Sequence, residues 1–197
     1  MSQIALFHSA LGVRAGVTDL AARLRDAGHE VLVVDQYDGR SFDTLDEAAG
    51  HVESVGFPAL MGRAVEAVAT LDDGFVAMGF SNGAGMAEFV ATQRAVSRVV
   101  LMSGALPLAV LGAQAWPSGV AVQLHYAAAD PHRVEEWVAA FVADVTASGA
   151  PLELHLDYPV AGHLFTDPTL PDEYDPAAAE LLTDRVLGFC APPAVPR

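Results

Sequence analysis

Gly79-Phe80-Ser81-Asn82-Gly83 follows an apolar run at 75–78 and precedes a segment, 83–94, whose apolar side chains recur at helical spacing. The pentapeptide is therefore expected to form a sharp turn between a buried strand and a helix. In such a turn the serine adopts a sparsely populated backbone conformation, so its hydroxyl stands clear of the sheet. The glycines two residues to either side leave room for the tight crossing. This pattern favours a nucleophilic serine at position 81.

A glycine-rich phosphate loop is the main alternative interpretation of this turn. Gly79, Gly83 and Gly85 do not have the spacing G-x-G-x-x-G of a dinucleotide-binding loop. No lysine follows them, as a P-loop would require. The alternative of a flavodoxin-like nucleotide binder is therefore weaker than that of a serine nucleophile.

Apolar and helical patterns alternate along the whole chain. Apolar, mostly β-branched runs predict strands, and amphipathic segments between most of them predict helices; the strands are expected at 4–8, 30–34, 75–78, 99–102, 120–125 and 152–156, and the helices at 13–27, 58–71, 83–94, 131–147 and 176–190. Alternation of this kind implies right-handed crossovers and a parallel sheet covered on both faces. The predicted fold class is α/β, doubly wound, with six parallel strands.

Two segments depart from this alternation. Residues 35–57 are polar and acidic, and residues 165–175 are rich in proline and aspartate. Both follow strands at their carboxyl ends, the side on which ligands bind in open α/β sheets. They are candidates for walls or lids of a binding crevice, and plain solvated loops are an equally good interpretation.

Composition limits the class of protein. The 197 residues, 52% of them hydrophobic, suit one globular domain over 1–190 followed by a flexible tail at 191–197. The formal net charge of −15 opposes nucleic-acid binding. Every long apolar run is interrupted, so no membrane helix is expected, and the amino terminus lacks the pattern of a secretory signal. The single cysteine, Cys190, is expected to be a packed thiol, which agrees with a cytoplasmic protein.

A serine nucleophile needs a base within hydrogen-bond reach and a carboxylate that orients the base. In chain order after the serine, Asp130 follows the fifth predicted strand and His163 follows the sixth. His8, at the end of the first strand, competes as the base but is better interpreted as a group that positions a loop. Asp157 and Asp167 are the alternative acids. The sequence thus predicts catalysis by Ser81, His163 and Asp130.

An oxyanion that forms during acyl transfer needs two preorganised donors. The backbone N–H of Asn82 is one candidate, because it lies at the positive end of the following helix. The turn after the first strand should supply the second, most plausibly through the N–H of Ala10. An ordinary strand-to-helix connection would have much the same sequence at this place.

Five stretches together carry a family resemblance: His8-Ser9-Ala10-Leu11-Gly12, Val34-Asp35-Gln36-Tyr37, the pentapeptide at Ser81, Ala128-Ala129-Asp130-Pro131 and Gly162-His163-Leu164-Phe165. As a set they resemble the dienelactone hydrolase family of α/β-hydrolases over nearly the whole chain. The resemblance implies a compact core of six parallel strands, without the extra amino-terminal strands of larger hydrolases. It also implies a triad of Ser81, Asp130 and His163.

The chain departs from this family at three positions. The best-known members use cysteine where this chain has Ser81. Ser9 stands where those enzymes carry a glutamate, and Asp167 stands where they carry an arginine that holds the substrate carboxylate. An aspartate there is expected to repel an anionic lactone.

The resulting expectation is a small serine hydrolase that cleaves a neutral carboxylic ester or lactone, with no metal or organic cofactor. An acyl or thioester transferase on the same triad, and a binding protein of the same fold without catalysis, are the alternatives. The sequence does not indicate an oligomeric state.

Overall fold

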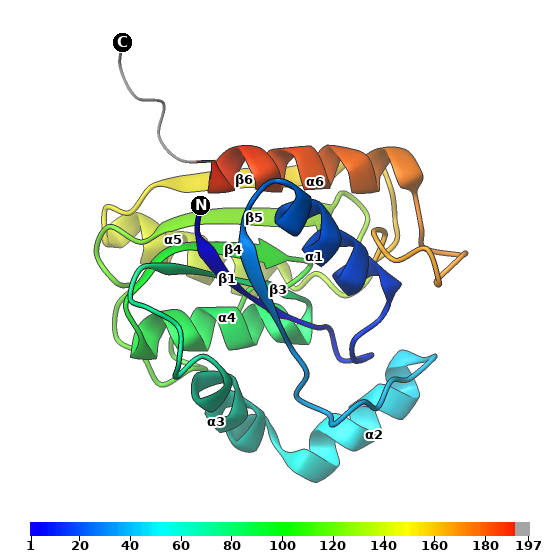
Figure 1. The fold of residues 1–197 in the computed structure, drawn as a ribbon, viewed down its shortest axis with the longest axis horizontal. Helices are drawn as coiled ribbons and strands as arrows, with labels where there is room; N and C mark the ends of the chain where they lie inside the picture. Colours follow the sequence, from blue (N-terminus) through cyan, green and yellow to red (C-terminus); the bar gives the residue numbers. More distant parts are fainter. Residues whose placement is uncertain (192–197) are drawn as a thin grey trace.

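A computed structural model describes residues 1–191. The flexible tail predicted for 191–197 therefore lies, apart from Ala191, outside the described residues. The elements follow one another as β1 (Gln3–Phe7), α1 (Ala15–Asp26), β2 (Glu30–Val34), α2 (Leu45–Val55), α3 (Phe57–Ala67), β3 (Phe75–Phe80), α4 (Asn82–Gln93), β4 (Val96–Met102), β5 (Ala121–Ala127), α5 (Glu135–Ala147), β6 (Leu152–Tyr158) and α6 (Pro176–Cys190) (Figure 1).

One parallel sheet with helices on both faces organises the chain, as the sequence predicts. The strand order in the six-stranded sheet is β2-β1-β3-β4-β5-β6. Because side chains alternate along a strand, β1 contributes Ile4 and Leu6 to one hydrophobic core and Ala5 and Phe7 to the other. Helices α1 and α6 close the first core, and α3, α4 and α5 close the second.

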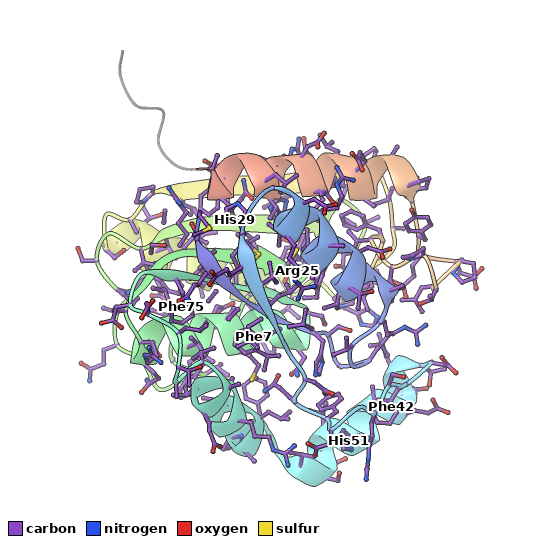
Figure 2. All side chains as sticks on the ribbon, in the orientation of Figure 1. Phe7, Arg25, His29, Phe42, His51 and Phe75 are labelled. Atoms are coloured by element: carbon purple, nitrogen blue, oxygen red, sulfur yellow. The ribbon has the colours of Figure 1, made fainter. Side chains whose placement is uncertain are left out.

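Side chains fill the space between the sheet and these helices (Figure 2). Phe7 and Phe75 are both buried in the core under α4. β3 is buried along its whole length, which explains its continuous apolar sequence. The turn that follows β3 is therefore anchored on a rigid central strand.

The segment predicted to be irregular at 35–57 contains a helix, so that prediction was wrong for 45–55. Helix α2 begins after Thr44, whose side chain accepts the N–H of Glu47 at 3.3 Å, and ends at Gly56 with a φ of 85°. Ala48 is its one buried residue, and Leu45, Val52 and Val55 on the same face are partly buried. His51 of α2 lies beside Phe42, with ring centroids 5.2 Å apart (Figure 2).

Other boundaries differ by a few residues. The helix predicted over 131–147 begins at Glu135, so His132 lies in a turn and not at a helix start. The helix predicted over 58–71 ends at Ala67, and the segment 165–175 forms turns without a helix or strand. Cys190 is fully buried, and burial raises the pKa of its thiol to about 12, as expected for a packed thiol.

The carboxyl ends of the strands place the predicted site residues at one edge of the sheet. His8 follows β1, Ser81 follows β3, Asp130 follows β5 and His163 follows β6. In the sheet, β2 lies on one side of β1 and β3 lies on the other, so the direction of winding changes at β1. A crevice opens where the winding direction changes in sheets of this kind, and Ser81 lies beside that point. No helix within residues 1–191 is long and apolar enough to cross a bilayer.

Candidate active site

Ser81 occupies a strained turn between β3 and α4. Its φ of 51° and ψ of −113° are rare for a residue with a side chain. The turn is held by a 2.7 Å hydrogen bond from the Ser81 N–H to the carbonyl of Met102 at the end of β4. A conformation of this kind costs about 1–3 kcal/mol, and it persists because the surroundings impose it.

Glycines allow backbone to approach backbone around this turn. A Cβ on Gly79 would meet the Gly83 carbonyl, and a Cβ on Gly83 would lie 2.6 Å from the Phe7 oxygen. These two contacts confirm the predicted role of the flanking glycines. Gly85 has a different neighbour, because a Cβ there would meet Leu106 Cδ1, in the loop after β4, at 2.8 Å.

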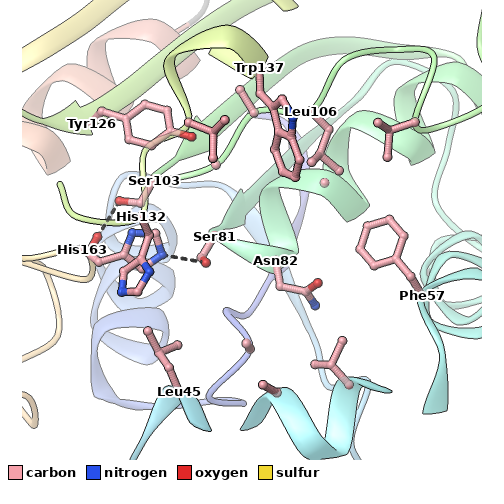
Figure 3. Close-up of a pocket in the computed structure, with 18 of the residues that line it drawn as sticks. Leu45, Phe57, Ser81, Asn82, Ser103, Leu106, Tyr126, His132, Trp137 and His163 are labelled. Carbon is pink, nitrogen blue, oxygen red and sulfur yellow. Dashed lines mark hydrogen bonds between the residues drawn. The ribbon is translucent and has the colours of Figure 1, made fainter. Parts of the chain in front are cut away.

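The structure brings Ser81, His163 and Asp130 into one hydrogen-bonded series. His163 Nε2 lies 2.8 Å from Ser81 Oγ (Figure 3). His163 Nδ1 lies 2.9 Å from each carboxylate oxygen of Asp130. His163 is 5% exposed and Asp130 is 8% exposed, so water competes little for these contacts. The N–H of His132 also donates to Asp130 Oδ1 at 2.8 Å, which fixes the carboxylate.

Contacts that the sequence analysis missed hold the His163 loop. Ser103 donates from Oγ to the His163 carbonyl at 2.6 Å (Figure 3). The side chain of Glu173 accepts the N–H of Leu164 at 2.6 Å, and Gly162 packs on the backbone of Glu173. Ser103, with a φ of 56°, ends β4 as Ser81 ends β3. The sequence signal for Ser103 is its position directly after an apolar strand and before Gly104.

His8 is not placed to act as the base for Ser81, because both of its ring nitrogens bond to the backbone. Its Nε2 accepts the N–H of Gln36 at 3.1 Å, so its Nδ1 carries the proton and donates to the Ser9 carbonyl at 2.7 Å. Burial lowers the pKa of His8 and so favours the neutral ring. Both ring nitrogens hold loops, in agreement with the positioning role that the sequence favours.

The alternative acids lie away from the serine. The Asp157 side chain is 83% exposed and its nearest cation is Arg185. Asp167 is buried, and its Oδ2 accepts from Arg14 Nε at 3.2 Å. Asp167 also accepts from the backbone and hydroxyl of Thr169. It does not line the cavity beside Ser81, so the expectation that it repels a substrate was wrong.

Ala10 and Asn82, the two predicted oxyanion donors, both line the cavity beside Ser81. Asn82 is the first residue of α4, where backbone N–H groups have no partner within the helix. The turn of Ala10 is fixed, because Leu11 and Gly12 both donate their N–H groups to Ser9. These positions suit the stabilisation of negative charge next to the serine.

A cavity of about 600 Å³ opens beside Ser81, and most of its wall is apolar. One side comes from α2 and α3 through residues such as Leu45 and Phe57, and another comes from the loop after β4 and the start of α5 (Figure 3). Among the described residues of this wall, Asp46 is the one carboxylate and none is lysine or arginine. Residues 1–191 contain no cluster of His, Cys, Asp or Glu that could hold a metal ion.

Glu88 is a second buried carboxyl group close to this cavity. It lies on α4, is fully buried, and both of its oxygens accept the N–H of Leu106, at 3.1 and 3.2 Å. Burial raises its pKa well above the ordinary range. Because Leu106 lines the cavity, Glu88 fixes the wall from behind. The sequence does not single out Glu88, since one acidic residue in a helix carries no signal of its own.

Comparison with known proteins gives the following. A model of the dienelactone hydrolase family matches residues 2–192, and no curated protein matches the chain. Among solved structures, a dienelactone hydrolase-like promiscuous phosphotriesterase from metagenomic libraries has a TM-score of 0.78 and 20% identity, covering 96% of this chain and 85% of its own. The protein m3DLH has a TM-score of 0.74 and 21% identity, covering 94% and 85%. The thioesterase domain from the curacin biosynthetic pathway has a TM-score of 0.62 and 14% identity, covering 94% and 90%.

Proposed function

The chain belongs to the dienelactone hydrolase family, and from this membership and the contacts of Ser81 we propose that it is a serine hydrolase of small carboxylic esters or lactones. Membership of this family supports a hydrolase with a small-molecule substrate. The observation that carries the finer proposal is the 2.8 Å contact between Ser81 Oγ and His163 Nε2, with Asp130 on the far nitrogen.

In the first half of the reaction, Ser81 Oγ attacks the ester carbonyl carbon and His163 Nε2 takes the hydroxyl proton. Asp130 keeps the proton of the neutral ring on Nδ1, so Nε2 is free to accept. The carbonyl oxygen becomes an oxyanion, which the N–H groups of Asn82 and Ala10 stabilise. The carbon–oxygen bond of the ester then breaks, and His163 returns the proton to the leaving alcohol.

In the second half, water attacks the acyl group on Ser81 and His163 takes a proton from that water. The bond between Ser81 Oγ and the acyl carbon breaks, the carboxylic acid leaves, and the serine recovers its proton. The proposal therefore needs no redox group and no metal ion, since every proton passes through His163.

An acyl or thioester transferase would use the same first half but pass the acyl group to an alcohol or thiol. The wall of the cavity includes side chains that are partly open to solvent, such as Trp137 at 44% exposure, and this favours water as the acceptor. Product analysis with added alcohol or thiol acceptors separates the two. A dominant transfer product at low acceptor concentration would replace the hydrolase proposal.

Fluorophosphonate labelling with peptide mapping tests the nucleophile. We expect one adduct, on the peptide that contains Ser81, and no adduct in Ser81→Ala. Labelling should be severely slowed in His163→Ala, because the hydroxyl then has no base. In triads of this type the loss of the nucleophile or of the base lowers turnover on the order of 10⁶-fold.

Ser54→Ala is a matched control, because it removes an exposed serine hydroxyl that does not line the cavity and leaves the proposed nucleophile in place. It should still form the adduct on Ser81. A binding protein without catalysis would form no adduct and turn over no ester in a broad panel. Labelling of Ser81→Ala equal to that of the unaltered protein would also contradict the proposal.

A further inference from the structure

Three large apolar side chains beside Ser81 are unusually open to solvent. Val110 is 53% exposed, Trp137 is 44% exposed and Val134 is 39% exposed. All three line the cavity, together with Leu106. These four residues are called the Trp137 shelf below. Solvent-exposed apolar surface that is gathered next to a reactive group marks a place where a ligand binds.

The Trp137 shelf is held in place by neighbouring residues. Val134 caps α5 and accepts the N–H of Trp137 at 3.0 Å. The neighbouring Arg133 donates to Glu135 at 2.7 Å and lies over the Tyr126 ring, 5.9 Å from its centroid. Leu106, which lies beside Trp137 in Figure 3, is fixed by Glu88 as described above. A preformed apolar surface binds a chain at a lower entropic cost than a mobile one.

Charge around the cavity disfavours an anionic substrate. Among the residues that line the cavity, Asp46, His163 and His132 can carry charge, and the His132 ring lies 4.8 Å from that of His163. The described wall has no lysine or arginine that could pair with a carboxylate, and the whole chain has a formal charge of −15. An apolar group therefore fits the shelf, whereas a carboxylate there would be unpaired.

Three groups surround the carbonyl carbon that Ser81 attacks: the leaving alcohol, the oxyanion and the acyl chain. The positions of the first two assign the Trp137 shelf to the acyl chain. The leaving alcohol must lie toward His163, which protonates it. The oxyanion must lie toward Ala10, whose turn is joined to the segment before α2 by the bond from Phe42 N–H to the Leu11 carbonyl, 2.9 Å. Leu45, the first residue of α2, lies on one side of Ser81, and Trp137 and Leu106 lie on the other (Figure 3). The acyl chain thus points to the shelf.

Resting on the proposed ester hydrolysis, we infer that this site selects uncharged esters with an apolar acyl chain, which lies on the Trp137 shelf. Small-molecule pockets span roughly 300–1,000 Å³, so the cavity of about 600 Å³ has room for an acyl chain of several carbons. The binding energy of acyl carbons far from the ester bond can lower the activation barrier, so a longer acyl chain should raise kcat/KM.

A chain-length series tests this inference. With p-nitrophenyl acetate and hexanoate, kcat/KM of the unaltered protein should rise at least about tenfold, since each fully buried methylene contributes about fourfold. Trp137→Ala should lower kcat/KM for hexanoate about tenfold and for acetate less than about twofold. The matched control is Leu181→Ala on α6, because Leu181 is 43% exposed but does not line the cavity; it should change neither value.

The p-nitrophenyl monoester of adipic acid has a hexanoyl-length chain that ends in a carboxylate, and it should react at least about tenfold more slowly than the hexanoate. An equal rate on these two esters would overturn the inference. A flat response to chain length, or an equal loss on acetate and hexanoate in Trp137→Ala, would also overturn it.

A binding measurement separates this inference from the proposed catalysis. The chain has two tryptophans, and Trp116 is buried, so a change in emission on ligand binding reports Trp137. In Ser81→Ala, ethyl hexanoate should produce a saturable blue shift that is absent in Ser81→Ala with Trp137→Phe. Monoethyl adipate should produce none at the same concentration. A shift without turnover in the unaltered protein would retain the shelf and reject the hydrolase; turnover without a shift would reject the shelf.

Discussion

Arg14 and Asp167 form a buried ion pair that joins two segments on either side of the site. Arg14 Nε donates to Asp167 Oδ2 at 3.2 Å, and Arg14 Nη1 donates to the carbonyl of Phe42 at 2.7 Å. The Arg14 side chain is 12% exposed and that of Asp167 is 7% exposed. One guanidinium therefore links the chain before α2 with the loop that follows His163.

Arg14→Gln should destabilise the fold, because it leaves the Asp167 carboxylate buried without its cation. The expected loss in the free energy of unfolding is about 2–4 kcal/mol by urea denaturation. Arg23→Gln is the control, because the pair of Arg23 with Glu180 is roughly half exposed and should contribute at most about 1 kcal/mol. Equal effects of the two substitutions would contradict the structural role of Arg14.

Asp130→Asn should retain the fold but lower turnover about 10⁴-fold, because an amide favours the wrong tautomer of His163. Ester hydrolysis at saturating substrate measures this loss. Asp157→Asn removes the exposed alternative acid and should leave turnover unchanged. A mild effect of Asp130→Asn, or a large one of Asp157→Asn, would assign the acid differently.

Two helical glycines give opposite predictions for the same substitution. Gly83→Ala in α4 would drive a Cβ to 2.6 Å from the Phe7 carbonyl oxygen, and neither backbone has room to move. We expect a loss of about 1–3 kcal/mol or more in the free energy of unfolding. Gly188→Ala in α6 meets no atom within 4 Å and should gain about 0.5–1 kcal/mol. Thermal or urea unfolding of both variants checks the close approach of α4 and β1.

Glu88 should make stability depend on pH in a particular direction. Burial raises the pKa of its carboxyl in the folded state, so the folded chain retains a proton that the unfolded chain has lost. Its contribution to stability is present below the unfolded pKa and is lost as the pH rises toward the folded value. Glu88→Gln has no carboxyl at this position, so its stability does not fall with pH for this reason. The free energy of unfolding of Glu88→Gln minus that of the unaltered protein should therefore grow by up to about 1.4 kcal/mol per pH unit.

Urea unfolding at a series of pH values from 5 to 9 measures this difference between the two proteins. Leu181→Ala, which removes no titratable group, is the control and should give a difference independent of pH over this range. A constant difference for Glu88→Gln would mean that the buried carboxyl is already ionised.

Much of this architecture is predictable from local pattern. The strands are short apolar runs between turn residues, and the elbow at Ser81 combines such a run with small residues and a helical pattern. Chain order and position at strand ends were enough to predict that Asp130 and His163 approach Ser81, because parallel strands bring their carboxyl ends to one edge.

Helix α2 was missed although local signals were present. Thr44 and Glu47 have the spacing of a capping box, and Gly56 marks the end of the helix. The acidic composition of 35–57 outweighed them, although Leu45, Ala48, Val52 and Val55 recur at helical spacing. The Trp137 shelf and the Glu88 contact could not be predicted, since they depend on how α5 and the loop after β4 pack across a cavity.

The most direct test of the central claim is the detection of an acyl group on Ser81 during turnover. The protein is mixed with p-nitrophenyl hexanoate, quenched in acid before the steady state, and digested for mass spectrometry. An acyl-enzyme on Ser81 should give a stoichiometric burst of p-nitrophenol and a hexanoyl group on the peptide that contains Ser81, both lost in Ser81→Ala. Continued turnover by Ser81→Ala, or a hexanoyl group on another residue in its place, would contradict it.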